Sequence, residues 1–207
     1  MSEVWSTSLK SLLREISLEA VRHQLKLQSA QIQELPSEKI ILGHWMSLAL
    51  LASSEMRVIF KVHFNTSALP DGIRIPKAED SKTTVRLMQD LMNEYCNLVI
   101  GLLKRSLLRS GLGAGVSLPV ALRGFDEVYF ANEEGQALKL DRWCIDSTDF
   151  SFCCSVQFEF LDASKLQEID FDFSVNGIVG NGELEWFDQS QDMLPQTSPH
   201  EEAKPCL

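Results

Sequence analysis

The chain has 207 residues, of which 44% are apolar and 23% are charged, and its formal net charge is −10. This composition is typical of an ordinary globular protein with one core, and the sequence contains no run of about 18 apolar residues that would span a membrane. The sequence also lacks a basic surface for nucleic acid and an N-terminal signal peptide, so we predict a cytoplasmic protein that binds neither nucleic acid nor membrane.

The N-terminal segment predicts an amphipathic helix over residues 8–34. Its apolar side chains recur at roughly helical spacing, and Pro36 is expected to end the helix. The positions that carry this pattern are Leu9, Leu12, Leu13, Ile16, Val21, Leu25 and Ile32.

Residues 40–64 predict a β-hairpin. An apolar run leads into a turn-like cluster at 52–55, and the run that follows alternates between apolar and polar side chains. One face of the second strand is apolar and should pack on a core. The other face, with Arg57, Lys61 and His63, is expected to meet water.

The strongest helix prediction covers residues 81–109. It follows a stretch at 65–80 that contains two prolines and a glycine and is expected to be a loop. Gly111 fits the C-terminal cap of the helix. One side of the helix is apolar through Val85, Met88, Leu91, Met92, Tyr95, Leu98, Val99, Leu102 and Leu103.

The next part of the chain predicts several strands, at residues 116–124, 125–130, 137–145 and 150–160. The last strand has a phenylalanine-rich face, which fits an antiparallel sheet with one covered side. The order of helix, hairpin, helix and strands predicts an α+β fold, with two long helices packed on one face of a mostly antiparallel β-sheet.

The C-terminal part of the chain is acidic and polar. A helical turn is expected at 163–168 and a short strand at 169–175. The last twenty residues contain three prolines and are expected to be disordered. We therefore predict one domain over residues 1–187, with its core at about 8–162, and an acidic tail over 188–207.

Familiar catalytic motifs are absent from the sequence. The four histidines are scattered, and no G-x-S-x-G elbow or phosphate-binding glycine loop is present. The cysteines form no C-x-x-C pair and show no disulfide-like spacing, so we expect reduced structural thiols and no zinc site. They are Cys96, Cys144, Cys153, Cys154 and Cys206.

The polar side of the helix at 81–109 carries the candidate site. Glu94 and Asn97 are three residues apart, so their side chains project side by side from one face. A carboxylate and a carboxamide can position a water and grip a cation, but they supply no nucleophile. Such pairs are also common on solvated helix faces, so the spacing alone does not assign a function.

The residues around this pair resemble the CheC/CheX-type chemotaxis phosphatase family. The family motif has an aspartate or serine, then three residues, a glutamate, two residues, an asparagine, and later a proline at the start of a strand. Asp90, Glu94, Asn97 and Pro119 follow this order, and Gly101 stands where the family has a glycine. No second E-x-x-N is present, so the chain resembles the single-site CheX type, with the fold predicted above.

The resemblance implies an aspartyl-phosphate protein phosphatase that acts on a CheY-like response regulator. The receiver domain of the partner would supply the acyl phosphate and Mg²⁺, and this chain would bind no cofactor of its own. Asn97 would orient the attacking water, and Glu94 would pair with the active-site lysine of the receiver. The other positions expected to contact the partner are Asp90, Asn93, Gly101 and Lys104.

Two further interpretations remain open at the level of sequence. The chain could be a catalytically silent CheX-like module that binds a receiver domain or another partner. It could also be a structural protein whose sheet edge dimerises, and the resemblance to CheX-type proteins implies a homodimer through sheet edges in either case.

Overall fold

The computed structural model describes residues 2–36, 41, 43–66, 81–123, 139–148 and 150–167. This part of the chain has an α+β fold, as predicted. Its helices are α1 (Ser2–Ala20), the short π-helix η1 (Val21–Leu25), α2 (Ser81–Arg109) and α3 (Ala163–Gln167). Its strands are β1 (Gln31–Glu34), β2 (Trp45–Ala52), β3 (Met56–Phe64), β4 (Gly115–Val116), β5 (Val120–Arg123), β6 (Lys139–Asp146) and β7 (Ser151–Phe160).

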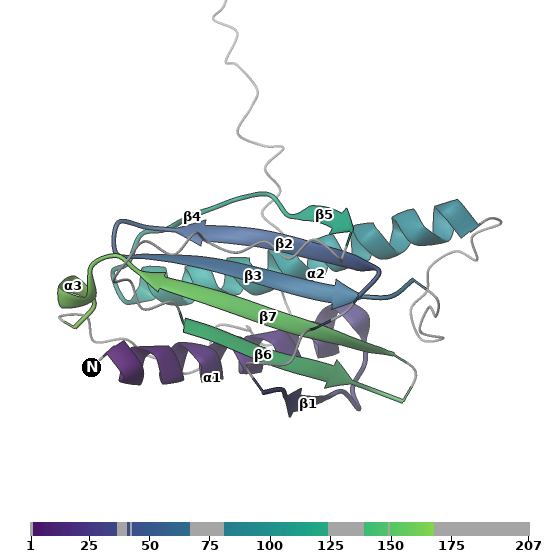
Figure 1. Cartoon of the computed structure of the whole chain (residues 1–207), viewed down its shortest axis with the longest axis horizontal. Helices are drawn as coiled ribbons and strands as arrows, with labels where there is room; N and C mark the ends of the chain where they lie inside the picture. The colour runs from purple at the N-terminus through teal and green to yellow at the C-terminus, as the bar shows by residue number, and fades with distance from the viewer. Residues whose placement is uncertain are drawn as a thin grey trace, which may run out of the picture.

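The described strands form one sheet in the order β1-β6-β7-β3-β2-β4, and β5 also pairs with β2 (Figure 1). Each strand pair in this part of the chain is antiparallel. The predicted hairpin is present as β2 and β3, which lie near the centre of the sheet, while the short strands β4 and β5 share the outer side of β2.

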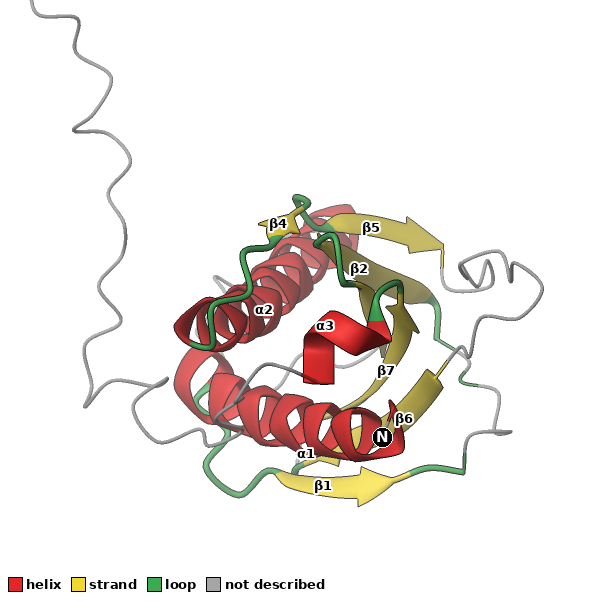
Figure 2. Cartoon of the chain, turned by 90° about the vertical axis from the view of Figure 1, so that its left-hand side faces the viewer, coloured by secondary structure: helices red, strands yellow, loops and turns green. Residues whose placement is uncertain are grey.

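Both long helices lie on the same face of this sheet, as predicted (Figure 2). The core fills the space between them and the sheet, because α1 and α2 bury their apolar sides against the apolar face of β3 and β7. Its largest fully buried side chains include Trp143, Tyr95, Phe60, Phe64 and Phe158.

The helix predicted over 8–34 ends earlier than expected. The α-helix stops at Ala20, the π-helical turn η1 follows, and Lys26 then adopts a left-handed backbone conformation with φ of 58°. Residues 31–34 form β1 and pair with β6. The helix prediction was wrong here because Ile32 satisfies a helical spacing, while its neighbours alternate in the two-residue period of an edge strand.

The helix predicted over 81–109 is confirmed at both ends, and Gly111 follows it with φ of 85°, the conformation of a C-terminal cap. The strand predicted over 116–124 is wrong in one respect, because it is divided into β4 and β5 by an interruption at Ser117–Pro119. The predictions at 67–80, 125–130, 169–175 and 188–207 lie outside the described residues.

The face of the sheet away from the long helices is more buried than predicted. Arg57 is exposed, but Lys61 and His63 on β3 are 0% and 2% exposed. Gln157 on β7 is also fully buried on this face. An alternating sequence pattern fixes the direction in which a side chain points, but it does not reveal what covers that face.

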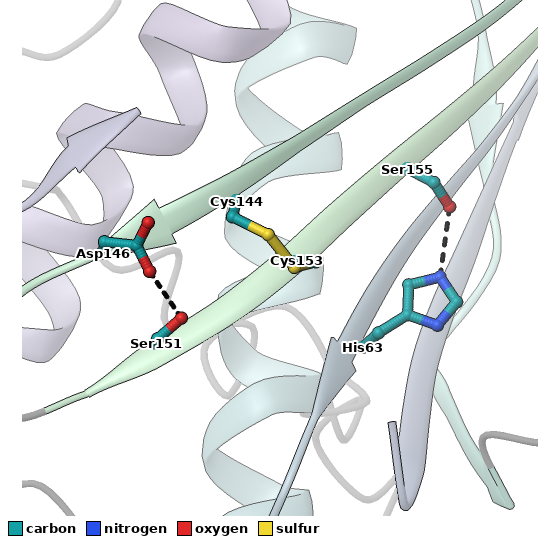
Figure 3. Close-up of a disulfide and its surroundings, with 6 residues drawn as sticks. All are labelled: His63, Cys144, Asp146, Ser151, Cys153 and Ser155. Carbon is teal, nitrogen blue, oxygen red and sulfur yellow. Dashed lines mark hydrogen bonds between the residues drawn. A yellow bond between two sulfur atoms is a disulfide. The ribbon is translucent and has the colours of Figure 1, made fainter. Parts of the chain in front are cut away.

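Two of the cysteines are paired, which contradicts the prediction of reduced thiols. Cys144 on β6 and Cys153 on β7 stand opposite each other in the strand register and form a disulfide (Figure 3). Sequence spacing could not show this pair, because strand register brings the two residues together. Cys96 and Cys154 are free and buried, and burial raises the pKa of both thiols, which keeps them protonated at neutral pH.

His63 lies beside this disulfide on the same face and shares a hydrogen bond of 3.2 Å with Ser155 (Figure 3). Burial, together with the nearby cations of Lys61 and Arg142, lowers the pKa of His63 from 6.5 to about 4. The folded protein therefore holds this imidazole neutral under conditions in which the unfolded chain would protonate it.

We expect the free energy of unfolding to fall as the pH drops from 6.5 towards 4, because the unfolded state binds the His63 proton first. The contribution of this group should be about 2–3 kcal/mol at most. Urea unfolding at both pH values checks this. Between the two pH values, the free energy of unfolding of His63→Gln should fall by less than that of the wild type. His44→Gln, at an exposed position, should lose as much as the wild type. An equal loss in His63→Gln would contradict the assignment.

No helix in the described residues is long and apolar enough to cross a membrane.

Candidate functional site

The rotation of α2 about its axis is fixed by contacts on three sides. The hydroxyl of Ser47 on β2 donates a hydrogen bond to the side-chain oxygen of Asn93. The hydroxyl of Tyr95 donates to the backbone carbonyl of Ser17 on α1 at 3.1 Å, and the Cys96 thiol faces the carbonyl of Phe60 on β3 at 3.8 Å. These three helix positions are thus directed towards β2, α1 and β3, which determines the face left for solvent.

The side chains of Asp90, Glu94 and Asn97 lie on that outer face and are exposed. None of the three has a side-chain hydrogen bond or ion pair with another residue in the described part of the chain. Their polar groups are therefore available to another molecule. A helix that is packed on three sides presents them from a rigid element, which favours accurate positioning.

Asn93 differs from the other residues predicted to contact a partner. It is half-buried, and its side-chain oxygen is engaged by Ser47. The structure therefore gives Asn93 a role in attaching α2 to β2, and leaves only its amide hydrogens for an external contact.

Asn93→Ala should lower the free energy of unfolding by about 1 kcal/mol, because Ser47 loses its hydrogen-bond acceptor. Chemical denaturation measures this loss. Asp90→Ala, one turn away at an exposed position, is the matched control and should change stability by less than about 0.5 kcal/mol. Equal effects of the two substitutions would contradict the anchoring role of Asn93.

Gly101 lies one turn beyond Asn97 and has no packing reason to be glycine. A Cβ atom placed on it would meet nothing within 4 Å. Glycine inside a helix costs about 1 kcal/mol relative to alanine, so the fold itself would favour alanine here. A helix glycine with open space above it is suited to close approach by another molecule. Lys104, one turn further on, is half-buried and belongs to the same side of α2.

The sheet edge beside α2 contains a bulge that the sequence prediction missed. Leu51 pairs with Val116 and Leu48 pairs with Val120. Two residues of β2 lie between these pairs, but three residues, 117–119, lie between them on the edge, so the edge carries one extra residue. Ser117 fixes the bulge, because its backbone N–H donates to the carbonyl of Leu50 and its hydroxyl accepts from the Leu50 N–H, both at 2.9 Å.

Leu118 is at the tip of this bulge and is 83% exposed. It is therefore a candidate site residue that sequence reasoning did not identify. The available signal was Pro119, since a proline inside a predicted strand cannot donate to a ladder and marks an edge or a bulge.

The polar groups on this surface are suited to positioning another molecule. The described residues contain no group of three or more side chains that could hold a metal ion, and α2 presents no nucleophile beside Asn97. A carboxamide offers both a donor and an acceptor, and a carboxylate attracts a cation. The arrangement fits a surface that assists a reaction at a site on another molecule.

No family model and no curated protein matches the sequence. Among solved structures, the fold is similar to the chemotaxis protein CheX from Vibrio vulnificus, with a TM-score of 0.52, 18% identity, and coverage of 72% of this chain and 97% of that chain. It is also similar to the CheX–CheY–BeF3–Mg²⁺ complex from Borrelia burgdorferi, with a TM-score of 0.56, 14% identity, and coverage of 72% and 95%. The chain has a CheX-like fold.

A CheC-like superfamily protein from Shewanella sp. PV-4 shares this fold as well, with a TM-score of 0.54, 14% identity, and coverage of 73% of this chain and 97% of that chain. The CheX-like fold agrees with the fold that the resemblance in the sequence implied. Because the sequences are so divergent, the chemistry of α2 must follow from the residues of this chain.

Proposed function

We propose that this chain is a phosphatase for the aspartyl phosphate of a CheY-like receiver domain. A water oxygen attacks the phosphorus atom of the receiver, and the bond from phosphorus to the carboxylate oxygen breaks. The bonding electrons return to the aspartate, and inorganic phosphate leaves with the oxygen and both protons that the water supplied. The chain needs to provide no nucleophile, because the water forms the new bond.

The observation that carries this proposal is that Glu94 and Asn97 lie one turn apart on the same exposed face of α2. Both side chains are free of partners within the described residues, while Asn93, Tyr95 and Cys96 hold the helix in place. One structure with a similar fold is a CheX in complex with CheY, BeF3 and Mg²⁺. Beryllofluoride resembles a phosphoryl group in shape and charge, which supports a phosphorylated receiver as the partner.

Asn97 is the residue that would orient the water. Its carboxamide oxygen can accept a hydrogen bond from the water, and its amide can donate to an oxygen of the phosphoryl group. Holding the attacking oxygen in line with the leaving carboxylate is the main contribution that a protein can make to this reaction.

Glu94 would fix the register of the complex. It lies one turn before Asn97 on the same face, where its carboxylate can pair with the lysine that receiver domains place beside the phosphoryl group. The Mg²⁺ ion would belong to the receiver, where it neutralises charge on the phosphoryl oxygens. Asp90 and Lys104 lie further along the same side of α2 and would contact the rim of the partner.

A panel of purified receiver domains, phosphorylated with a small-molecule phosphodonor, tests the proposal. Binding to each receiver and the lifetime of its acyl phosphate are measured separately in the presence of this chain. The proposal predicts at least one receiver that binds and loses its phosphate faster. Binding without faster loss would instead identify a silent receiver-binding module.

A further inference from the structure

We propose that Leu118 is a docking residue for the phosphorylated receiver domain, and that the bulge at Ser117–Pro119 serves to display it. This inference rests on the proposed function and extends the partner surface from α2 to the sheet edge. The occupant would be a receiver whose phosphoaspartate is bordered by apolar side chains, because Leu118 can stabilise a contact only by burying apolar surface.

The position of Leu118 relative to Asn97 follows from the directions of α2 and β2. The helix α2 runs in the same direction as β2 (Figure 1). Asn93, in the middle of the helix, is hydrogen-bonded to Ser47 near the start of β2. Gly115, six residues after the helix, pairs with Ala52 at the end of β2. Asn97 is about 6 Å beyond Asn93 along the helix. The bulge lies opposite Ala49, about 7 Å beyond Ser47 along the strand. The two positions are therefore level.

They also lie on the same flank of the molecule. Residues four apart in a helix share a side, so Asn97 lies on the side of α2 that Asn93 turns towards β2. Both β4 and β5 contact α2 and occupy the outer side of β2 (Figure 2). A partner that reaches Asn97 from solvent therefore meets Leu118 at the adjacent edge, with open space above Gly101.

The geometry of the edge favours a receiver over a second copy of this chain. Pairing of two sheet edges needs a continuous row of backbone donors and acceptors. This edge is interrupted, because β4 has only two residues and Pro119 has no N–H to donate. The exposed feature is the Leu118 side chain, and the bulge that carries it is held by two hydrogen bonds between Ser117 and Leu50.

Leu118→Ser should weaken docking without affecting the chemical step. We expect the KM for the phosphorylated receiver to rise by about tenfold with kcat unchanged, since loss of the apolar surface that a leucine side chain buries has an effect of this size. Affinity for a receiver loaded with beryllofluoride, measured by titration, should fall by the same factor. The melting temperature should not change, because Leu118 is 83% exposed.

Leu108→Ser is the matched control. Leu108 is 60% exposed on α2, about 16 Å beyond Asn97, and its replacement should leave KM within about twofold of the wild type. An unchanged KM and affinity in Leu118→Ser, with an active wild type, would overturn the docking role and leave the proposed function intact. A fall in the sedimentation mass of Leu118→Ser, with unchanged affinity, would overturn it in favour of a second copy. A wild type that does not shorten the phosphate lifetime would instead refute the proposed function.

Discussion

Asn97→Ala should slow phosphate release from a receiver by about tenfold or more at saturating concentrations, towards the rate of the receiver alone, because alanine removes the carboxamide that would orient the water. The decrease should appear in kcat, while KM changes little, since Glu94 and the rest of the surface remain. The fold should be intact, because the Asn97 side chain is exposed and has no hydrogen bond to another described residue. Stopped-flow fluorescence of the receiver measures both constants.

Asp90→Ala provides the control for this result. Asp90 lies on the same exposed face, two turns before Asn97, and is expected to contact only the rim of the partner. Its replacement should change kcat by less than about twofold. If Asn97→Ala had the kcat of the wild type, this result would show that Asn97 takes no part in the chemical step.

Arg14→Met should give a large loss of stability for the substitution of a single charged residue. Arg14 on α1 forms two hydrogen bonds with Asp141 on β6, at 2.7 and 2.8 Å, and the Asp141 side chain is only 8% exposed. Removing the guanidinium leaves this carboxylate buried without its cation. We expect the free energy of unfolding to fall by about 2–3 kcal/mol, allowing for partial solvent access to Arg14.

Glu34→Gln is the matched control for this network. Glu34 on β1 also pairs with Arg14, but its side chain is 69% exposed. Its replacement should cost less than about 1 kcal/mol, because an exposed ion pair is screened by water. Urea unfolding of the two variants checks the contrast, and similar losses would show that burial of Asp141 does not determine the strength of this network.

The sequence allowed the long helix α2 to be predicted to the residue, because it combines a full apolar face with a terminating glycine at Gly111. The strand β1 was missed, because Ile32 alone satisfies both the helical and the strand period. The disulfide between Cys144 and Cys153 was missed because strand register is not encoded in sequence spacing. Long-range partners therefore limited the fold prediction more than local periodicity did.

In the candidate site, too, features set by local periodicity were predicted and features set by long-range contacts were missed. The exposed positions of Glu94 and Asn97 follow from helical periodicity, and the structure agrees with it. The attachment of Asn93 to Ser47 and the position of Leu118 depend on which strand lies beside α2. No helical wheel contains that information, because the neighbouring strand comes from another part of the chain.

The most direct measurement is the single-turnover decay of the acyl phosphate on a bound receiver, with this chain in saturating excess and Mg²⁺ present. If α2 presents Asn97 to the phosphoaspartate, decay should be first-order, at least about tenfold faster than in the receiver alone, and should yield unmodified aspartate and inorganic phosphate. A decay rate equal to that of the free receiver, under conditions in which binding is complete, would contradict the phosphatase function.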